Sequence, residues 1–217
     1  MHIQNVPRHD VSNEISGLMS IPELSESLLL LRWHKSLDKN GVSPNAVKVL
    51  EIEFKSKLLN FTNLWLCDET VSYPSWLTGL IKALPKKGKL LDLSNWRGIV
   101  LMDIVSKVVS VFVNVRLQKL MKIRGLPFQF GATPKLGCQD AVFVLKAFLQ
   151  ERREKMLDTW VAFVDLIKAY DSVQHRVIDA TLEIFGVPTD VRSWVRRLYD
   201  GSTLEINVGK TNKIITY

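Results

Sequence analysis

The sequence predicts an α+β protein in which helices dominate and the sheet is small. Long stretches carry apolar residues at helical spacing, whereas only a few short β-branched or aromatic runs are typical of strands. Apolar residues make up 47% of the 217 residues and charged residues 24%, which are the proportions of an ordinary folded protein. A chain of this length buries a sizeable core in one large domain or in two small ones.

Two helices are expected early in the chain. Ser20 and Glu23 form a capping box that opens the first helix, which is expected to end near Asp38. Ser43 opens the second helix, whose apolar positions keep helical spacing as far as Leu64.

A long β-hairpin is expected next. Residues 76–84 and 95–101 are the strand candidates, and a Pro-Lys-Lys-Gly sequence that follows the first of them is typical of a turn. This arrangement places Lys86, Lys87 and Lys89 at the tip of the hairpin.

The rest of the chain alternates helices with short strands. Helices are expected at about 103–122, 139–155, 175–185 and 190–199. The apolar run Trp160 to Val164 predicts a buried strand that ends at Asp165. Residues 204–217 predict a second hairpin.

The positive charge is concentrated in one segment. The chain has 29 Lys and Arg against 22 Asp and Glu, a net charge of +7, and residues 82–130 alone carry 10 basic and 2 acidic side chains, a net +8. Such a local excess favours a phosphate-rich partner, and a solvated basic face is the alternative.

Several classes of protein are excluded by the composition. The two cysteines, Cys67 and Cys138, lie 71 positions apart, which fits neither a disulfide framework nor a zinc site. The N-terminus lacks the apolar core of a signal peptide, and Asp103 and Lys107 interrupt the most apolar stretch. We therefore expect an intracellular protein, nuclear or cytoplasmic, that is neither secreted nor embedded in a membrane.

Asp165 is the most informative candidate for chemistry. A carboxylate at the end of a buried strand is held rigidly and faces a cleft, where it is suited to Mg²⁺, an ion that prefers oxygen ligands. The alternative is a structural one, in which Asp165 caps the helix that follows.

The residues around Asp165 resemble motif A of the reverse transcriptases of non-LTR (LINE-type) retrotransposons. That motif has an apolar strand, the catalytic Asp and then Lys-Ala-aromatic-Asp-x-Val, and the stretch from Phe163 to Val173 is similar to it. The maturase-like reverse transcriptases of mobile introns share these motifs, and the Lys-Ala-Tyr-Asp-Ser-Val string favours the retrotransposon form.

Four further segments resemble the same family in the same order. The stretch from Leu84 to Leu101 is similar to the fingers motif Pro-Lys-x-Gly followed by Asn-Tyr-Arg-Pro-Ile-Ser-Leu. Lys107 and Arg116 fit the Lys-x₈-Arg-Leu of the next helix, and 129–131 fit its Gln-Phe-Gly. Residues 38–48 are more loosely similar to the upstream Gly-x-Asp-Gly-Ile segment.

The resemblance implies roles for individual residues. Asp165 and the carbonyl of Leu166 would ligate catalytic Mg²⁺, or alternatively Mn²⁺, in a two-metal phosphoryl transfer. Tyr170 matches the aromatic residue beneath the incoming sugar. Arg97, with Lys86 or Lys87, would contact the nucleotide triphosphate. The implied partners of the full enzyme are an RNA template, a DNA primer and deoxynucleoside triphosphates; no protein partner is evident.

The resemblance also implies a helix-rich, partial right-hand polymerase fold with a small antiparallel sheet and packed helices. Its expected parts are an N-terminal tail at 1–24, a fingers-like region at 25–158 and a partial palm at 159–217.

Some residues depart from the family pattern. Gly98 replaces the usual Pro, and Ala132 replaces the second Phe of Gln-Phe-Gly-Phe. No Asp-Asp pair occurs in the sequence, and Tyr217 falls about where the Gly-x-x-Gln-Gly segment is expected to begin. Because two metal ions need more than one carboxylate, we expect this chain alone to be an inactive fragment of an RNA-directed DNA polymerase. The alternative function is that of a nucleic-acid-binding remnant without catalysis.

Overall fold

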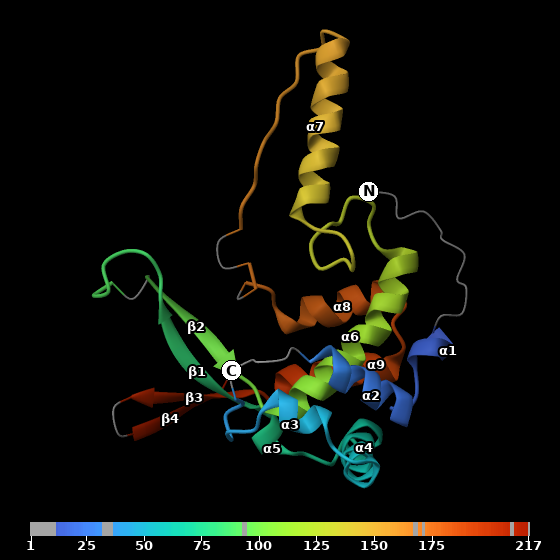
Figure 1. Ribbon diagram of the computed structural model, residues 1–217, viewed down its shortest axis with the longest axis vertical. Coiled ribbons are helices and arrows are strands. Elements are labelled where there is room, and N and C mark those ends of the chain that lie inside the picture. Colours follow the sequence, from blue (N-terminus) through green and yellow to red (C-terminus); the bar gives the residue numbers. More distant parts are fainter. Residues whose placement is uncertain are drawn as a thin grey trace.

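The computed structural model describes residues 12–31, 37–92, 95–166, 169–170, 172–208 and 211–216 (Figure 1). The helices are α1 (Ser12–Ile15), α2 (Ile21–Leu30), α3 (Pro44–Lys48), α4 (Ile52–Cys67), α5 (Pro74–Leu77), α6 (Ile104–Arg124), α7 (Cys138–Glu154), α8 (His175–Ile184) and α9 (Thr189–Asp200). The strands are β1 (Thr78–Pro85), β2 (Trp96–Leu101), β3 (Thr203–Val208) and β4 (Thr211–Thr216). The predicted α+β class is confirmed.

The sheet is mixed, and the expectation of an antiparallel sheet is wrong. Its strand order is β2-β1-β3-β4, so both predicted hairpins form and lie side by side. Each hairpin is antiparallel, but β1 and β3 pair in parallel, with Gly79 opposite Leu204. This pairing joins residues more than a hundred positions apart, and no local pattern in the sequence specifies it.

Helix α6 is the centre of the core. Val108, Val109 and Phe112 on this helix are at most 1% exposed. The centroid of the Phe112 ring lies 5.9 Å from the centroid of the Trp194 ring on α9. Because α6 also packs against α1, α2 and α5, one apolar helix holds the N-terminal and C-terminal parts of the chain together.

Two predicted helices are shorter than expected. The first ends at Leu30, because Leu31 takes an extended conformation with ψ 134°. The second is divided into α3 and α4, with Val49 and Glu51 outside helical geometry. Val49 is β-branched, and such residues form helix weakly. The Lys48 ammonium donates to the carbonyl of Leu29 at 3.0 Å, which holds α3 against α2.

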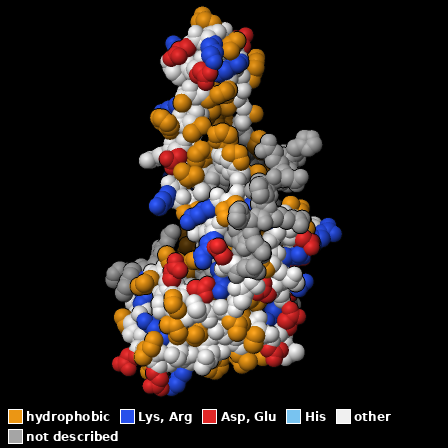
Figure 2. All heavy atoms as spheres, turned by 90° about the vertical axis from the view of Figure 1, so that its right-hand side faces the viewer, with side chains coloured by type: hydrophobic (Ala, Val, Ile, Leu, Met, Phe, Trp, Pro, Cys, Tyr) orange, Lys and Arg blue, Asp and Glu red, His pale blue; other side chains and the backbone are white. Residues whose placement is uncertain are grey.

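Residues 138–166 form an arm that projects from the rest of the molecule (Figure 1). The arm consists of α7 and the extended segment 157–166, which runs back beside the helix. The Arg152 guanidinium joins the two by donating to the carbonyl of Asp158 at 2.7 Å and to Thr159 Oγ1 at 3.1 Å. No residue of α7 is buried, and Figure 2 shows apolar side chains along the arm.

The predicted buried strand from Trp160 to Val164 is not formed. These residues follow an irregular extended path, and the side chains of Trp160, Phe163 and Val164 are 97%, 86% and 85% exposed. A strand requires a neighbour for its backbone groups, and within the described residues no strand pairs with this segment.

None of the helices in the described part of the chain combines the length and the apolarity that a membrane crossing requires.

Candidate functional site

The β1–β2 hairpin presents the basic candidate residues. Its ladder pairs Leu84 with Arg97, and the Lys86 amide continues it by donating to the carbonyl of Asn95 at 2.6 Å. Within the connection, Asn95 Nδ2 donates to the carbonyl of Lys89 at 3.0 Å and Trp96 Nε1 donates to that of Leu90 at 2.9 Å. These hydrogen bonds hold the connection in one conformation, and the lysines project from it.

Strand alternation gathers positive charge on one face of this hairpin. Arg97 lies opposite Leu84, and Leu84 is two residues from Lys82 on β1, so the side chains of Lys82 and Arg97 lie on the same face. Lys86, two residues after Leu84, continues this row past the end of the strand. Lys86, Lys87 and Arg97 are all exposed. The Arg97 guanidinium has no hydrogen-bond or ion-pair partner among the residues that the structure describes, so its five donors face solvent.

The other candidate residues are Asp165 and Leu166 at the end of the arm and Tyr170, which follows the arm in the sequence. Asp165 is exposed, and Leu166 and Tyr170 are 68% and 96% exposed. Ile167, Lys168 and Asp171 of the predicted motif lie outside the described residues. The hairpin and the end of the arm are separate in Figure 1, so the structure does not bring the two groups of candidates together.

The donors at Asp165 suit a divalent metal in kind but not in number. A carboxylate and the backbone carbonyl of Leu166 are the hard oxygen ligands that Mg²⁺ prefers. Across the described parts of the chain, however, no three Asp, Glu, His or Cys side chains gather into a group that could hold a metal ion. These residues alone do not complete a metal centre.

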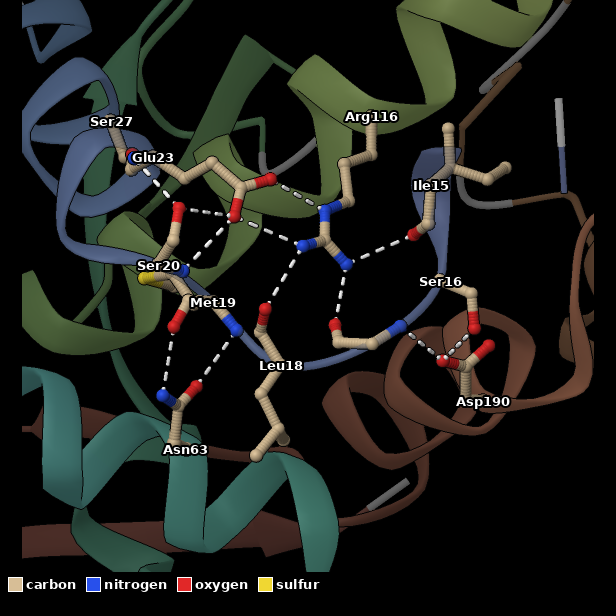
Figure 3. A network of polar contacts seen from close by, with 11 residues as sticks. Ile15, Ser16, Leu18, Met19, Ser20, Glu23, Ser27, Asn63, Arg116 and Asp190 are labelled. Atoms are coloured by element: carbon tan, nitrogen blue, oxygen red, sulfur yellow. Dashed lines mark hydrogen bonds and ion pairs between the residues drawn. The ribbon is translucent and has the colours of Figure 1, made fainter. Parts of the chain in front are cut away.

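A polar network around Arg116 was not foreseen from the sequence (Figure 3). Its guanidinium, 4% exposed, donates to the carbonyls of Ile15, Gly17 and Leu18 at 2.6–3.1 Å. It also forms a bidentate pair with Glu23 at 2.9 and 3.0 Å. All five N–H donors are therefore used, and the ring of Phe112 lies 4.2 Å below the guanidinium.

The same N-terminal segment is held from two more helices. Asn63 of α4 donates to the Met19 carbonyl at 2.8 Å and accepts from its amide at 2.9 Å. Asp190 of α9 accepts from the Ser16 hydroxyl at 2.6 Å and from the Gly17 amide at 2.9 Å. Residues 15–20 thus join α4, α6 and α9 (Figure 3).

Two carboxyl groups of this network have lowered pKa values. Partial burial raises the pKa of Glu23, and the hydrogen bonds from Arg116 and Ser20 lower it by more. Burial likewise raises the pKa of Asp190, and donors from Ser16, Gly17 and Val191 outweigh that effect. One signal in the sequence pointed to this network: Arg116 falls on the apolar stripe of α6, where an arginine requires a buried partner.

The fold and its exposed basic hairpin define a helix-rich α+β protein with a cationic surface. A family profile described as "Reverse transcriptase (RNA-dependent DNA polymerase)" matches residues 84–217. The chain therefore belongs to the reverse transcriptase family.

Its relatives include proteins of transposable elements. The chain is 25% identical over 193 residues to the Transposon TX1 uncharacterized 149 kDa protein of Xenopus laevis, an alignment that covers 83% of this chain and 14% of that protein. It is 28% identical over 158 residues to the Retrovirus-related Pol polyprotein from type-1 retrotransposable element R2 of Popillia japonica, covering 71% and 22%. It is 23% identical over 168 residues to the corresponding type-2 R2DM polyprotein of Drosophila melanogaster, covering 77% and 15%.

The resemblance to reverse transcriptases of non-LTR retrotransposons is thereby confirmed. The chain spans less than a quarter of the length of each of these relatives.

Proposed function

We propose that this chain is part of a retrotransposon RNA-directed DNA polymerase, and that its β1–β2 hairpin contacts nucleic-acid and nucleotide phosphates. The observation that carries the proposal is the exposed cationic face of the hairpin, on which Arg97 has no described partner. A planar guanidinium is suited to two parallel hydrogen bonds with a phosphate, and lysines such as Lys86 and Lys87 act as point charges beside it.

In this proposal, residues 25–158 are the fingers-like region and residues 159–217 are part of the palm. The substrates of the complete enzyme are an RNA template, a DNA primer and deoxynucleoside triphosphates. Tyr170 would lie beneath the sugar of the incoming nucleotide.

The metal chemistry of the complete enzyme is assigned to Asp165 and the Leu166 carbonyl. When bound, divalent cations activate the primer hydroxyl and neutralise the leaving pyrophosphate. Asp165 supplies one negative charge and hard oxygen donors, and further carboxylates are needed to complete such a site. We therefore propose that the 217-residue chain alone does not polymerise.

The phosphate contacts are tested by RNA binding at several salt concentrations. Lys86→Ala combined with Lys87→Ala should weaken binding and reduce the salt slope by about 0.7 for each single-strand phosphate that the variant no longer neutralises. The control removes the same charge from α4, as Lys55→Ala with Lys57→Ala, and should leave the slope nearly unchanged. Equal effects of the two double variants would contradict a hairpin-specific contact.

Catalysis is tested by primer extension with the purified chain and Mg²⁺. We expect no extension. Extension that Asp165→Ala abolishes would show that the chain alone is a polymerase and would refute its proposed inactivity.

A second candidate function is nucleic-acid binding without catalysis. It is favoured by the same exposed hairpin and by the absence, among the described residues, of a carboxylate group able to hold a metal. RNA binding that depends steeply on salt but is indifferent to Mg²⁺ and to Asp165→Asn would support this function. Binding that Mg²⁺ strengthens only when Asp165 is intact would support the polymerase.

A further inference from the structure

Strand β2 lies at one edge of the sheet (Figure 1). The strand order is β2-β1-β3-β4, and within the described residues no strand pairs with the outer side of β2. Consecutive residues of this strand are exposed: Arg97, Gly98, Ile99 and Val100. An edge of this kind presents a row of amides and carbonyls to which another strand can be added.

The register shows which backbone groups of β2 point outward. The Lys86 amide donates to the carbonyl of Asn95, and the β1–β2 ladder continues from that pair. In an antiparallel ladder every second residue bonds to the neighbouring strand, so Arg97 and Ile99 bond to β1. The amide and carbonyl of Gly98, which lies between them, therefore point away from β1 toward the free edge.

Gly98 leaves this edge able to pair. Proline is usual at this position in the pattern that residues 84–101 resemble, and a proline would have no amide to donate. Prolines and bulges protect edge strands from pairing with other chains. β2 contains no proline, and its register with β1 runs without a bulge. The strand is therefore an unprotected edge.

The sequence of β2 is complementary to a second copy of itself. In an antiparallel pair of two β2 strands centred on Gly98, Arg97 lies opposite Ile99 of the second copy. Trp96 then lies opposite Val100 of the second copy. No arginine faces an arginine directly, and aromatic and β-branched side chains, which pair favourably across strands, come together.

We propose that two copies of this chain pair through their β2 strands, antiparallel and centred on Gly98, and so form a dimer with one continuous sheet. Because side chains alternate between the two faces of a sheet, the cationic faces of both hairpins lie on the same side of the joined sheet. One strand from each copy buries less than the roughly 1,200 Å² of a stable complex, so the dimer is weak. The pairing does not rest on the proposed polymerase function.

Sedimentation velocity tests the proposal in a chain with Phe143→Lys and Phe148→Lys, which removes apolar contacts of the arm. At tens of micromolar we expect a monomer–dimer equilibrium that salt strengthens, because salt screens the two Arg97 side chains, which are diagonal neighbours in the pair. Gly98→Pro should raise the dissociation constant by about tenfold or more, since each copy loses an amide hydrogen bond. Gly98→Ala is the matched control, because it keeps the amide and its Cβ atom would lie 3.6 Å from the nearest atom, Cγ2 of Ile81.

Three outcomes would overturn the proposal. They are a monomer at every concentration, a Gly98→Pro variant that dimerises as well as Gly98→Ala, and assemblies that grow beyond the dimer, which would indicate head-to-tail pairing of β2 with a different edge.

Hydrogen exchange locates the pairing within the strand. The amides of Gly98 and Val100 should exchange more slowly as the protein concentration rises. The amide of Ile99 already bonds to β1, so its exchange should not change. Protection of Gly98 that is independent of concentration would assign the edge to a segment of the same chain and would refute the dimer.

A disulfide test checks the register and does not require Gly98→Pro to fold. In chains with Cys67→Ser and Cys138→Ser, a mixture of Arg97→Cys and Ile99→Cys chains should form an intermolecular disulfide. These two positions lie opposite each other in the pair, where their Cα atoms are within about 7 Å. Each variant alone should cross-link much less. A mixture that cross-links no better than either variant alone would refute the proposed pairing.

Discussion

Arg116 illustrates how a single residue organises the core of this protein. A charged side chain is tolerated inside a protein only when its donors are satisfied, and here three backbone carbonyls and one carboxylate satisfy all five. The carbonyls belong to residues 15–18, so the side chain binds the N-terminal segment to α6. Residues 1–24 were expected to be a tail, and the part from Ile15 to Leu24 includes buried side chains of the core cluster.

Removing this guanidinium should destabilise the fold strongly. Arg116→Met keeps the apolar part of the side chain but removes the ion pair to Glu23 and leaves three carbonyls without their donor. Breaking a buried pair in this way costs about 3–5 kcal/mol. Urea denaturation measures the loss in free energy of unfolding. Arg153→Met on the exposed end of α7 is the control and should change it by less than about 0.5 kcal/mol. Similar losses for both variants would contradict the role of the network.

The carboxyl groups of the network should make the fold sensitive to acid. The pKa values of Glu23 and Asp190 are lower in the folded protein than their ordinary values of about 4.3 and 3.9. Their contribution to stability is therefore complete above those values and is lost as the pH falls through the lower folded pKa values. We expect a constant melting temperature from about pH 5 to 7 and a decline below about pH 4.

Asp190→Asn should make this acid-dependent decline shallower, because it removes one of the two titrating groups. Thermal melts at several pH values measure it, with Asp158→Asn on the exposed arm as the control. An unchanged profile in Asp190→Asn would contradict the assignment.

At the scale of elements, β1 lies so close to its neighbouring strands that one of its positions has no room for a side chain. A Cβ atom at Gly79 would collide with Cγ1 of Val100 and lie 3.1 Å from Cδ2 of Leu204. At Gly98 on β2 the nearest atom, Cγ2 of Ile81, would lie 3.6 Å away, which is an ordinary contact. The two glycines of one hairpin therefore have different structural roles.

Gly79→Ala should destabilise the protein by about 1–3 kcal/mol through overpacking. Gly98→Ala is the matched control and should be neutral or slightly stabilising, because it reduces the freedom of the unfolded chain without creating a collision. Melting temperatures of both variants check the prediction. A loss in Gly98→Ala as large as that in Gly79→Ala would show that the collision is not the cause.

At the scale of the whole molecule, the arm carries several large apolar side chains that remain exposed to water. Phe143 and Phe148 on α7 are 73% and 51% exposed, in addition to the segment from Trp160 to Val164. Exposed apolar area of this kind favours association between molecules. The pattern of α7 is that of an amphipathic helix, but the described residues provide no surface that covers its apolar side.

We therefore expect the purified chain to self-associate at tens of micromolar, and Phe143→Lys with Phe148→Lys to reduce this association. Sedimentation velocity measures the distribution of species. Leu29→Lys, which removes a 70% exposed leucine from α2, is the control and should have a smaller effect. A monomer that melts cooperatively and reversibly at the same concentration would contradict this expectation.

The sequence determined the elements that depend on neighbouring residues. The capping box of Ser20 and Glu23, the helix that begins near Asp103 and both hairpins agree with prediction, because their hydrogen bonds join residues close in the chain. The family motifs could also be read from the sequence, whereas the arrangement in space of the hairpin and the arm could not, since it depends on tertiary packing.

Only the tertiary structure decided the features that depend on distant residues. These are the parallel pairing of β1 with β3, the network that joins Arg116 to residues about a hundred positions earlier, and the lack of a partner for Trp160 to Val164 among the described strands. An apolar, β-branched run specifies that a segment can become a strand. Whether it does depends on a neighbour that satisfies its backbone groups, and a periodic pattern carries no information about that neighbour.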